Sequence, residues 1–152
     1  LNFKKLLKRQ GFRKTLGNPL TSDGIPGTVL ALVKAYEVFK ESTYRDAAES
    51  ILDQYPCHLV HENISQDVGL AGLGELYLEA DRVFDNPKWK QKADWLVNFF
   101  LPTRIEDPAE RCYWLNNNAS VPTADLMVGT GGVIHFLIRA LNQNKVGYRL
   151  HN

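Results

Sequence analysis

A pair of glycines three residues apart recurs three times in this chain and constrains its fold more than any other feature. The first glycines of the three motifs lie 45 and 60 residues apart, and each motif opens an apolar run. Glycine tolerates unusual dihedrals at a helix entry and lets another backbone approach closely. Repetition at this spacing indicates stacked supersecondary units, here helical hairpins. The motifs are Gly24-Ile25-Pro26-Gly27, Gly69-Leu70-Ala71-Gly72 and Gly129-Thr130-Gly131-Gly132.

Apolar residues recur at helical spacing through most of the chain, and strand signals are scarce. We expect Ser42 or Thr43 to cap one helix and Pro102 to end another. The last helix is apolar on nearly all sides, so we expect it to be buried on most faces. The sequence predicts an all-α fold with helices over residues 3–10, 25–39, 44–52, 70–83, 89–100 and 133–141.

The stretch from residue 102 to residue 125 contains three prolines and a run of three asparagines. We expect a long loop there, with one short strand around residues 112–115. Loops of this length in compact domains are often functional.

The composition excludes several classes of protein. The 152 residues fit one domain, and a formal net charge of +1 argues against a nucleic-acid-binding protein. The basic residues near the start fit either a solvated helix face or a phosphate or membrane patch. No apolar run is long enough to cross a bilayer, so we expect no membrane partner. Two cysteines are too few for a disulfide framework, which favours the cytoplasm. The basic residues are Lys4, Lys5, Lys8, Arg9, Arg13 and Lys14.

The glycine motifs, together with the segment from Ala124 to Arg139, resemble the lanthionine synthetase C-like (LanC-like) family. Its members are α/α toroids of seven helical hairpins whose inner helices open with G-x-x-G. The resemblance covers about residues 21–141. It implies that residues 1–152 are the C-terminal segment of such a domain, a partial toroid of about three hairpins. The sequence has no initiator methionine, and we expect the remainder of the toroid to lie on the same polypeptide. Exposed inner faces would then favour homo-oligomers of the fragment.

The resemblance also implies an activity. In LanC-like cyclases a zinc ion holds the thiolate of a substrate cysteine, which adds to a dehydrated Ser or Thr and closes a thioether ring. The family's ligand positions fall here on Ser22, Asp67 and Val68, none of which is Cys or His. Zinc sites need three good protein ligands. We therefore expect no zinc cofactor, as in the similar cyclase domains of class III lanthipeptide synthetases.

A second group of possible ligands lies before the middle glycine motif. Cys57, His58, His61 and Glu62 are close in sequence, and His58 and His61 would share a face if the segment were helical. A zinc site relocated to Cys57, His58 and His61 is one interpretation. A buried cysteine beside surface histidines on a loop is the other.

Four residues are weighed for a role in acid–base catalysis. Asp23 and Asp67 stand just before glycine motifs, where they would serve either as helix caps or as groups at the mouth of the toroid. Asp125 has the same two interpretations. His135 lies in the last apolar helix and would either protonate an enolate in the cavity or pack as a core histidine.

These observations leave two main hypotheses for function. The first is a zinc-independent lanthipeptide cyclase domain that acts on a dehydrated precursor peptide and confines its reacting groups. The alternative is a degenerate module that binds a peptide or protein partner without catalysis. An unrelated toroidal hydrolase would need a pair of carboxylates facing one cavity, and the sequence alone places no such pair.

Overall fold

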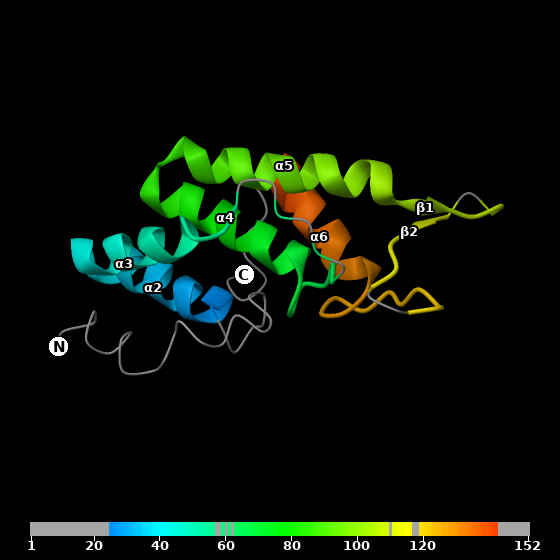
Figure 1. Cartoon of the computed structure of the whole chain (residues 1–152), viewed down its shortest axis with the longest axis horizontal. Coiled ribbons are helices and arrows are strands. Elements are labelled where there is room, and N and C mark those ends of the chain that lie inside the picture. Colours follow the sequence, from blue (N-terminus) through cyan, green and yellow to red (C-terminus); the bar gives the residue numbers. More distant parts are fainter. Residues whose placement is uncertain are drawn as a thin grey trace.

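The computed structural model describes residues 25–56, 59, 61, 63–109, 111–116 and 119–142, and within them the chain is mostly helical, with long loops before Leu70 and before Thr130 (Figure 1). This confirms the predicted all-α class. The expected helix over residues 3–10 lies outside the described residues. In the described part of the chain, no helix is both long and apolar enough to span a bilayer. The helices are α2 (Ile25–Phe39), α3 (Ser42–Leu52), α4 (Leu70–Phe84), α5 (Pro87–Thr103) and α6 (Thr130–Leu141).

The helices form hairpins around a central helix. Short turns join α2 to α3 and α4 to α5, and the helices of each pair pack against one another. Helix α4 also packs against α2 on one side and α6 on the other, so it lies in the middle of the array (Figure 1). Both turns contain a non-glycine residue in the left-handed region, Lys40 at φ 58° and Asp85 at φ 51°. Such residues reverse the chain directly after a helix.

Aromatic side chains fill the core between α4, α5 and α6. Trp89 and Phe100 of α5 are fully buried and approach α4 and α6 respectively. The ring of Trp89 stacks on Tyr77 at 6.2 Å between centroids, and Phe100 meets Phe136 edge to face at 5.9 Å. Burial of rings this large supplies much of the apolar contact that holds such helices together.

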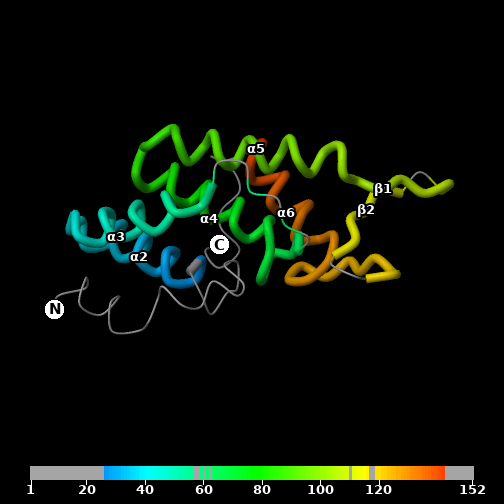
Figure 2. The backbone as a smooth tube through the Cα atoms, viewed as in Figure 1, coloured from blue at the N-terminus to red at the C-terminus, as the bar shows by residue number. Residues whose placement is uncertain are grey.

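The long segment between α5 and α6 carries a small hairpin. Strands β1 (Ile105–Glu106) and β2 (Cys112–Tyr113) pair antiparallel, and the hairpin extends away from the helices (Figure 2). The predicted strand is therefore present, although it is shorter than expected. Trp114, which follows β2, is buried and donates its indole N–H to the carbonyl of Phe100 at 3.0 Å. This bond attaches the segment to α5.

Two predictions about helix ends were wrong. Ser42 is the first residue of α3, and the cap position is Glu41, whose side chain makes no capping hydrogen bond. Pro102 does not end α5, which runs to Thr103. A proline removes only one N–H donor, which here would reach the carbonyl of Asn98, and the hydroxyl of Thr103 adds a further bond to this last turn by donating to the carbonyl of Phe99 at 2.9 Å.

The prediction that α6 is buried on most faces was also wrong. Ile134, Ile138 and Leu141 share one side of the helix and are 42%, 46% and 78% exposed. Within the described chain, α4 and α5 are the helices that pack on α6, and they cover only its opposite side. A hydrophobic pattern indicates which side chains of a helix can be buried. Which of them are buried depends on the helices that pack against it.

Candidate functional site

The glycine motifs that open α4 and α6 allow the loop before each of these helices to fold back onto the helix start. A Cβ placed on Gly69 would lie 2.4 Å from the backbone nitrogen of Ser65, and one on Gly72 would lie 2.2 Å from the carbonyl oxygen of Gln66. The N–H groups of Leu70 and Gly72 donate to carbonyls of that loop, at Asn63 (3.0 Å) and Ser65 (3.2 Å). Loop carbonyls thus satisfy N–H donors that a helix start leaves unpaired.

The loops before α4 and α6 also bond to one another. The N–H groups of Gln66 and Asp67 both donate to the carbonyl of Met127 at 3.0 Å. A Cβ on Gly132 would lie 2.8 Å from the Cβ of Gln66. The glycines therefore set the first turns of α4 and α6 side by side.

Buried charges lie between α4 and α6. Glu75 and Glu79 of α4 and Arg139 of α6 are each at most 1% exposed. The guanidinium of Arg139 donates to Glu75 through one nitrogen and to Glu79 through another, the latter at 2.6 Å. Burial of charge is tolerated only when the charges are paired and hydrogen-bonded, and these bonds meet that condition.

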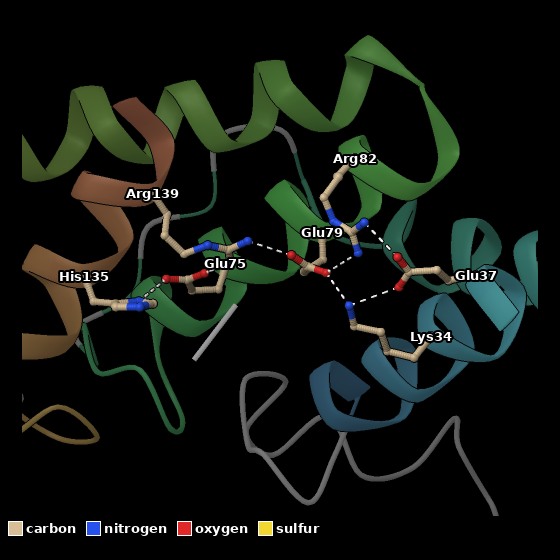
Figure 3. Close-up of polar contacts among 7 residues, drawn as sticks. All are labelled: Lys34, Glu37, Glu75, Glu79, Arg82, His135 and Arg139. Carbon is tan, nitrogen blue, oxygen red and sulfur yellow. Dashed lines mark hydrogen bonds and ion pairs between the residues drawn. The ribbon is translucent and has the colours of Figure 1, made fainter. Parts of the chain in front are cut away.

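The network continues from α4 to α2 (Figure 3). The other oxygen of Glu79 accepts hydrogen bonds from Lys34 at 2.6 Å and Arg82 at 2.9 Å. Lys34 and Arg82 also pair with Glu37 at 3.1 Å and 2.7 Å. Burial alone would raise the pKa of Glu79, but the hydrogen bonds from Arg82, Lys34 and Arg139 outweigh it and hold the pKa at about 2. Glu79 is thus the point at which all three helices are joined.

His135 lies at the α6 end of this network (Figure 3). Its Nδ1 is 2.7 Å from an oxygen of Glu75, and its side chain remains 23% exposed. Glu75 therefore has a ring nitrogen on one oxygen and a guanidinium nitrogen on the other, both supplied by α6. This contact is compatible with both interpretations of His135, a core histidine satisfied by a hydrogen bond and a group that exchanges a proton in the cavity.

The network occupies equivalent positions of the three repeats, which sequence analysis missed. Lys34, Glu79 and Arg139 each stand seven residues after the last glycine of their motif, and they carry alternating charges. Glu75 and His135 each stand three residues after it. Counting onward from the glycines, and asking which charges fall in otherwise apolar helices, would have found these residues.

Of the predicted catalytic residues Asp23, Asp67 and His135, the structure describes Asp67 and His135. Asp67 is half-buried in the loop before α4, and its carboxylate makes no hydrogen bond or ion pair with His135 in the described chain. Asp23 lies outside the described residues. Asp125 accepts hydrogen bonds from the N–H groups of Met127 at 2.7 Å and Val128 at 2.8 Å, which stabilises the turn before α6. It is not the predicted helix cap, because the cap position of α6 is Gly129 and carries no side-chain hydrogen bond.

The positions implied for zinc ligands do not fit a zinc ion. Val68 has only a hydrocarbon side chain, and its N–H donates to the hydroxyl of Ser65 at 3.2 Å. Ser22 lies outside the described residues. Of the two described positions Asp67 alone could ligate, whereas zinc needs three good protein ligands. Of the second group, Cys57, His58 and Glu62 lie outside the described residues. His61 accepts a hydrogen bond at Nδ1 from the N–H of Asn63 at 3.0 Å. Within the described residues, no three possible ligands cluster.

Comparison with known proteins identifies a family. The model for "Lanthionine synthetase C-like protein" matches residues 18–146, which is most of the chain. No curated protein matches the sequence. The match contains all three glycine motifs and every residue of the charged network.

Proposed function

The chain belongs to the lanthionine synthetase C-like family, and from this premise we propose that it forms part of a cyclase domain acting on a dehydrated precursor peptide. The helices, a fragment of the family's α/α toroid, would supply part of the surface that confines the peptide. Confinement raises the effective concentration of the thiol and its acceptor. The observation that carries the proposal is a partly exposed imidazole, His135, held at the edge of an otherwise buried charged network.

The chemistry requires a proton acceptor for the thiol. In the proposed reaction, His135 takes the proton from the cysteine S–H, and the sulfur attacks the β carbon of the dehydroamino acid. The C–S bond forms as the C=C π bond breaks, and the resulting enolate takes a proton at its α carbon from the imidazolium. Histidine can serve in both steps because it titrates near neutral pH. Asp67 and Asp23 remain candidates for further acid–base groups or for contacts to the peptide.

Ring formation by the full-length protein tests this proposal. Cyclisation is an isomerisation, so the unchanged mass must be combined with thiol alkylation and fragmentation of a synthetic peptide that contains dehydroalanine and one free cysteine. We expect loss of the alkylatable thiol with the wild type. We expect His135→Ala to slow the reaction by roughly 100-fold, the lower end for general acid–base catalysis. The exposed Glu106→Gln variant is the matched control. Equal rates with and without protein would refute the proposal.

Metal content distinguishes a zinc-independent reaction from a relocated zinc site. We expect the protein, purified without chelators, to contain far less than one zinc per chain by inductively coupled plasma mass spectrometry. The reason is the unsuitable donor set at Ser22, Asp67 and Val68. Zinc at about one per chain would contradict zinc independence. Its loss in a Cys57→Ala variant would then assign the metal to Cys57, His58 and His61.

A binding module without catalysis is the second candidate function. The unmatched zinc ligands favour it, because a family member that has lost its metal can retain the peptide surface. Retention of the dehydrated peptide with no ring formation would support it. A precursor peptide as partner, self-association of the fragment and a cytoplasmic location stay predictions.

A further inference from the structure

The carboxylate of Glu75 is placed to control which nitrogen of His135 carries a proton. Glu75 has no exposed surface, and Nδ1 of His135 lies 2.7 Å from its Oε1. A carboxylate can only accept hydrogen bonds, so the proton in this contact belongs to Nδ1. In a neutral imidazole the other nitrogen, Nε2, is then bare and can accept a proton.

Glu75 is itself fixed by a second partner. Arg139, one helical turn beyond His135 on α6, donates to the other oxygen of Glu75. Arg139 also donates to Glu79, which Lys34 of α2 and Arg82 of α4 hold as well. The carboxylate of Glu75 therefore has little freedom to turn away from the imidazole.

The remaining nitrogen of His135 is uncommitted. In the part of the chain that the structure describes, Nε2 makes no hydrogen bond, and the side chain of His135 is 23% exposed to solvent. The charged groups facing the imidazole from α4 and α6 are Glu75 and, through it, Arg139. One nitrogen thus faces the buried network while the other is left for an external group.

We propose that Glu75 is a positioning residue that holds His135 in the Nδ1–H form, with Nε2 as the proton acceptor for the substrate thiol. This inference rests on the proposed cyclase function. When Nε2 takes the thiol proton, Glu75 faces the resulting imidazolium and stabilises its charge until the proton passes to the α carbon of the enolate. A carboxylate behind a catalytic histidine fixes both the tautomer and the ring orientation.

The tautomer can be measured without an activity assay. Two-bond proton–nitrogen correlation spectra of the uniformly ¹⁵N-labelled protein, recorded over a pH series, distinguish a protonated Nδ1 from a protonated Nε2. A His135→Gln variant assigns the signals among the four histidines of the chain. We expect the wild type to show Nδ1–H and a bare Nε2, although isolated histidine side chains prefer the opposite tautomer. A wild-type spectrum with Nε2–H would overturn the inference, whatever the variants do.

Variants then test the effect on the reaction. We expect Glu75→Gln to shift the tautomer towards Nε2–H and to lower kcat for ring formation about 10- to 100-fold, with little change in KM. Glu106→Gln, which alters an exposed carboxylate on β1, is the control for the change of charge. Circular dichroism shows whether each variant is folded. If Glu75→Gln does not fold, the tautomer of His135 in the wild type is by itself the test of the positioning role of Glu75.

Failure of the catalytic role of His135 can be distinguished from failure of the positioning role of Glu75. A wild type with Nδ1–H whose His135→Gln variant closes rings at the wild-type rate would remove the catalytic role of His135, and with it this inference. A wild type with Nε2–H whose His135→Gln variant is inactive would refute the positioning role of Glu75 and leave the proposed function standing. Nδ1–H in the wild type, combined with losses of activity in both variants, supports the two together.

Discussion

We expect Glu79→Gln to lower the free energy of unfolding at pH 7 by about 3–5 kcal/mol, the range for removing one partner of a buried ion pair. Glu79 is 1% exposed and accepts hydrogen bonds from Lys34, Arg82 and Arg139, which come from three different helices. A neutral amide in its place leaves these three cations with only the carboxylates of Glu37 and Glu75, so one positive charge in the network loses its compensation. Urea denaturation followed by circular dichroism would measure the change.

The pH dependence of this loss identifies its cause. The pKa of Glu79 falls from its ordinary value of 4.5 to about 2, which corresponds to roughly 3 kcal/mol of stability. A carboxyl group with a depressed pKa contributes this stability above pH 4.5, and the contribution disappears as the pH falls from 4.5 towards 2. We therefore expect the difference between the wild type and Glu79→Gln to shrink over that interval.

An exposed glutamate serves as the control. Glu106 pairs with Arg104 at 2.7 Å on the surface, where its side chain is 57% exposed. Exposed ion pairs contribute at most about 1 kcal/mol. Equal and small losses for Glu79→Gln and Glu106→Gln would show that the buried network does not hold the helices together.

The helices could be predicted from the sequence because their apolar spacing is strong. The expected helix over residues 25–39 coincides with α2, and the one over residues 70–83 stops one residue short of the end of α4. The glycine motifs correctly indicated a close approach of backbones at Gly69, Gly72 and Gly132. The periodicity of apolar residues and the positions of glycines are local properties of the sequence, so they can be interpreted without knowing which segments pack together.

The partners of individual side chains could not be predicted in the same way. Glu75 and Glu79 suggest a solvated face when α4 is considered alone, because a glutamate is rarely buried without a partner. Their partner Arg139 is 64 and 60 residues away and comes close only when α6 packs on α4. His135 was singled out from the sequence, but its contact with Glu75 depends on the same packing.

The second prediction with a large expected effect on stability concerns Gly72, one of the glycines at the start of α4. We expect Gly72→Ala to lower the free energy of unfolding by about 3 kcal/mol, the upper end for overpacking a tight contact. The new Cβ would lie 2.2 Å from the carbonyl oxygen of Gln66, so the loop before α4 must move. Movement would weaken the bonds from the N–H of Gly72 to Ser65 and from the N–H of Gln66 to Met127, which join the loop to α4 and to the loop before α6.

An exposed position on another helix provides the control for helix propensity. Ala31 lies on the exposed side of α2, and Ala31→Gly should cost about 1 kcal/mol because glycine is the poorer helix former. Propensity alone would make Gly72→Ala stabilising by a similar amount. The sign of the change at residue 72, measured by urea denaturation, therefore decides between the two effects. A stabilised Gly72→Ala protein would mean that this glycine is not needed for contact between the loop and the helix. The packing of α4 on α6, and with it the contact of Glu75 with His135, would then have to be maintained by the ion pairs and the aromatic core alone.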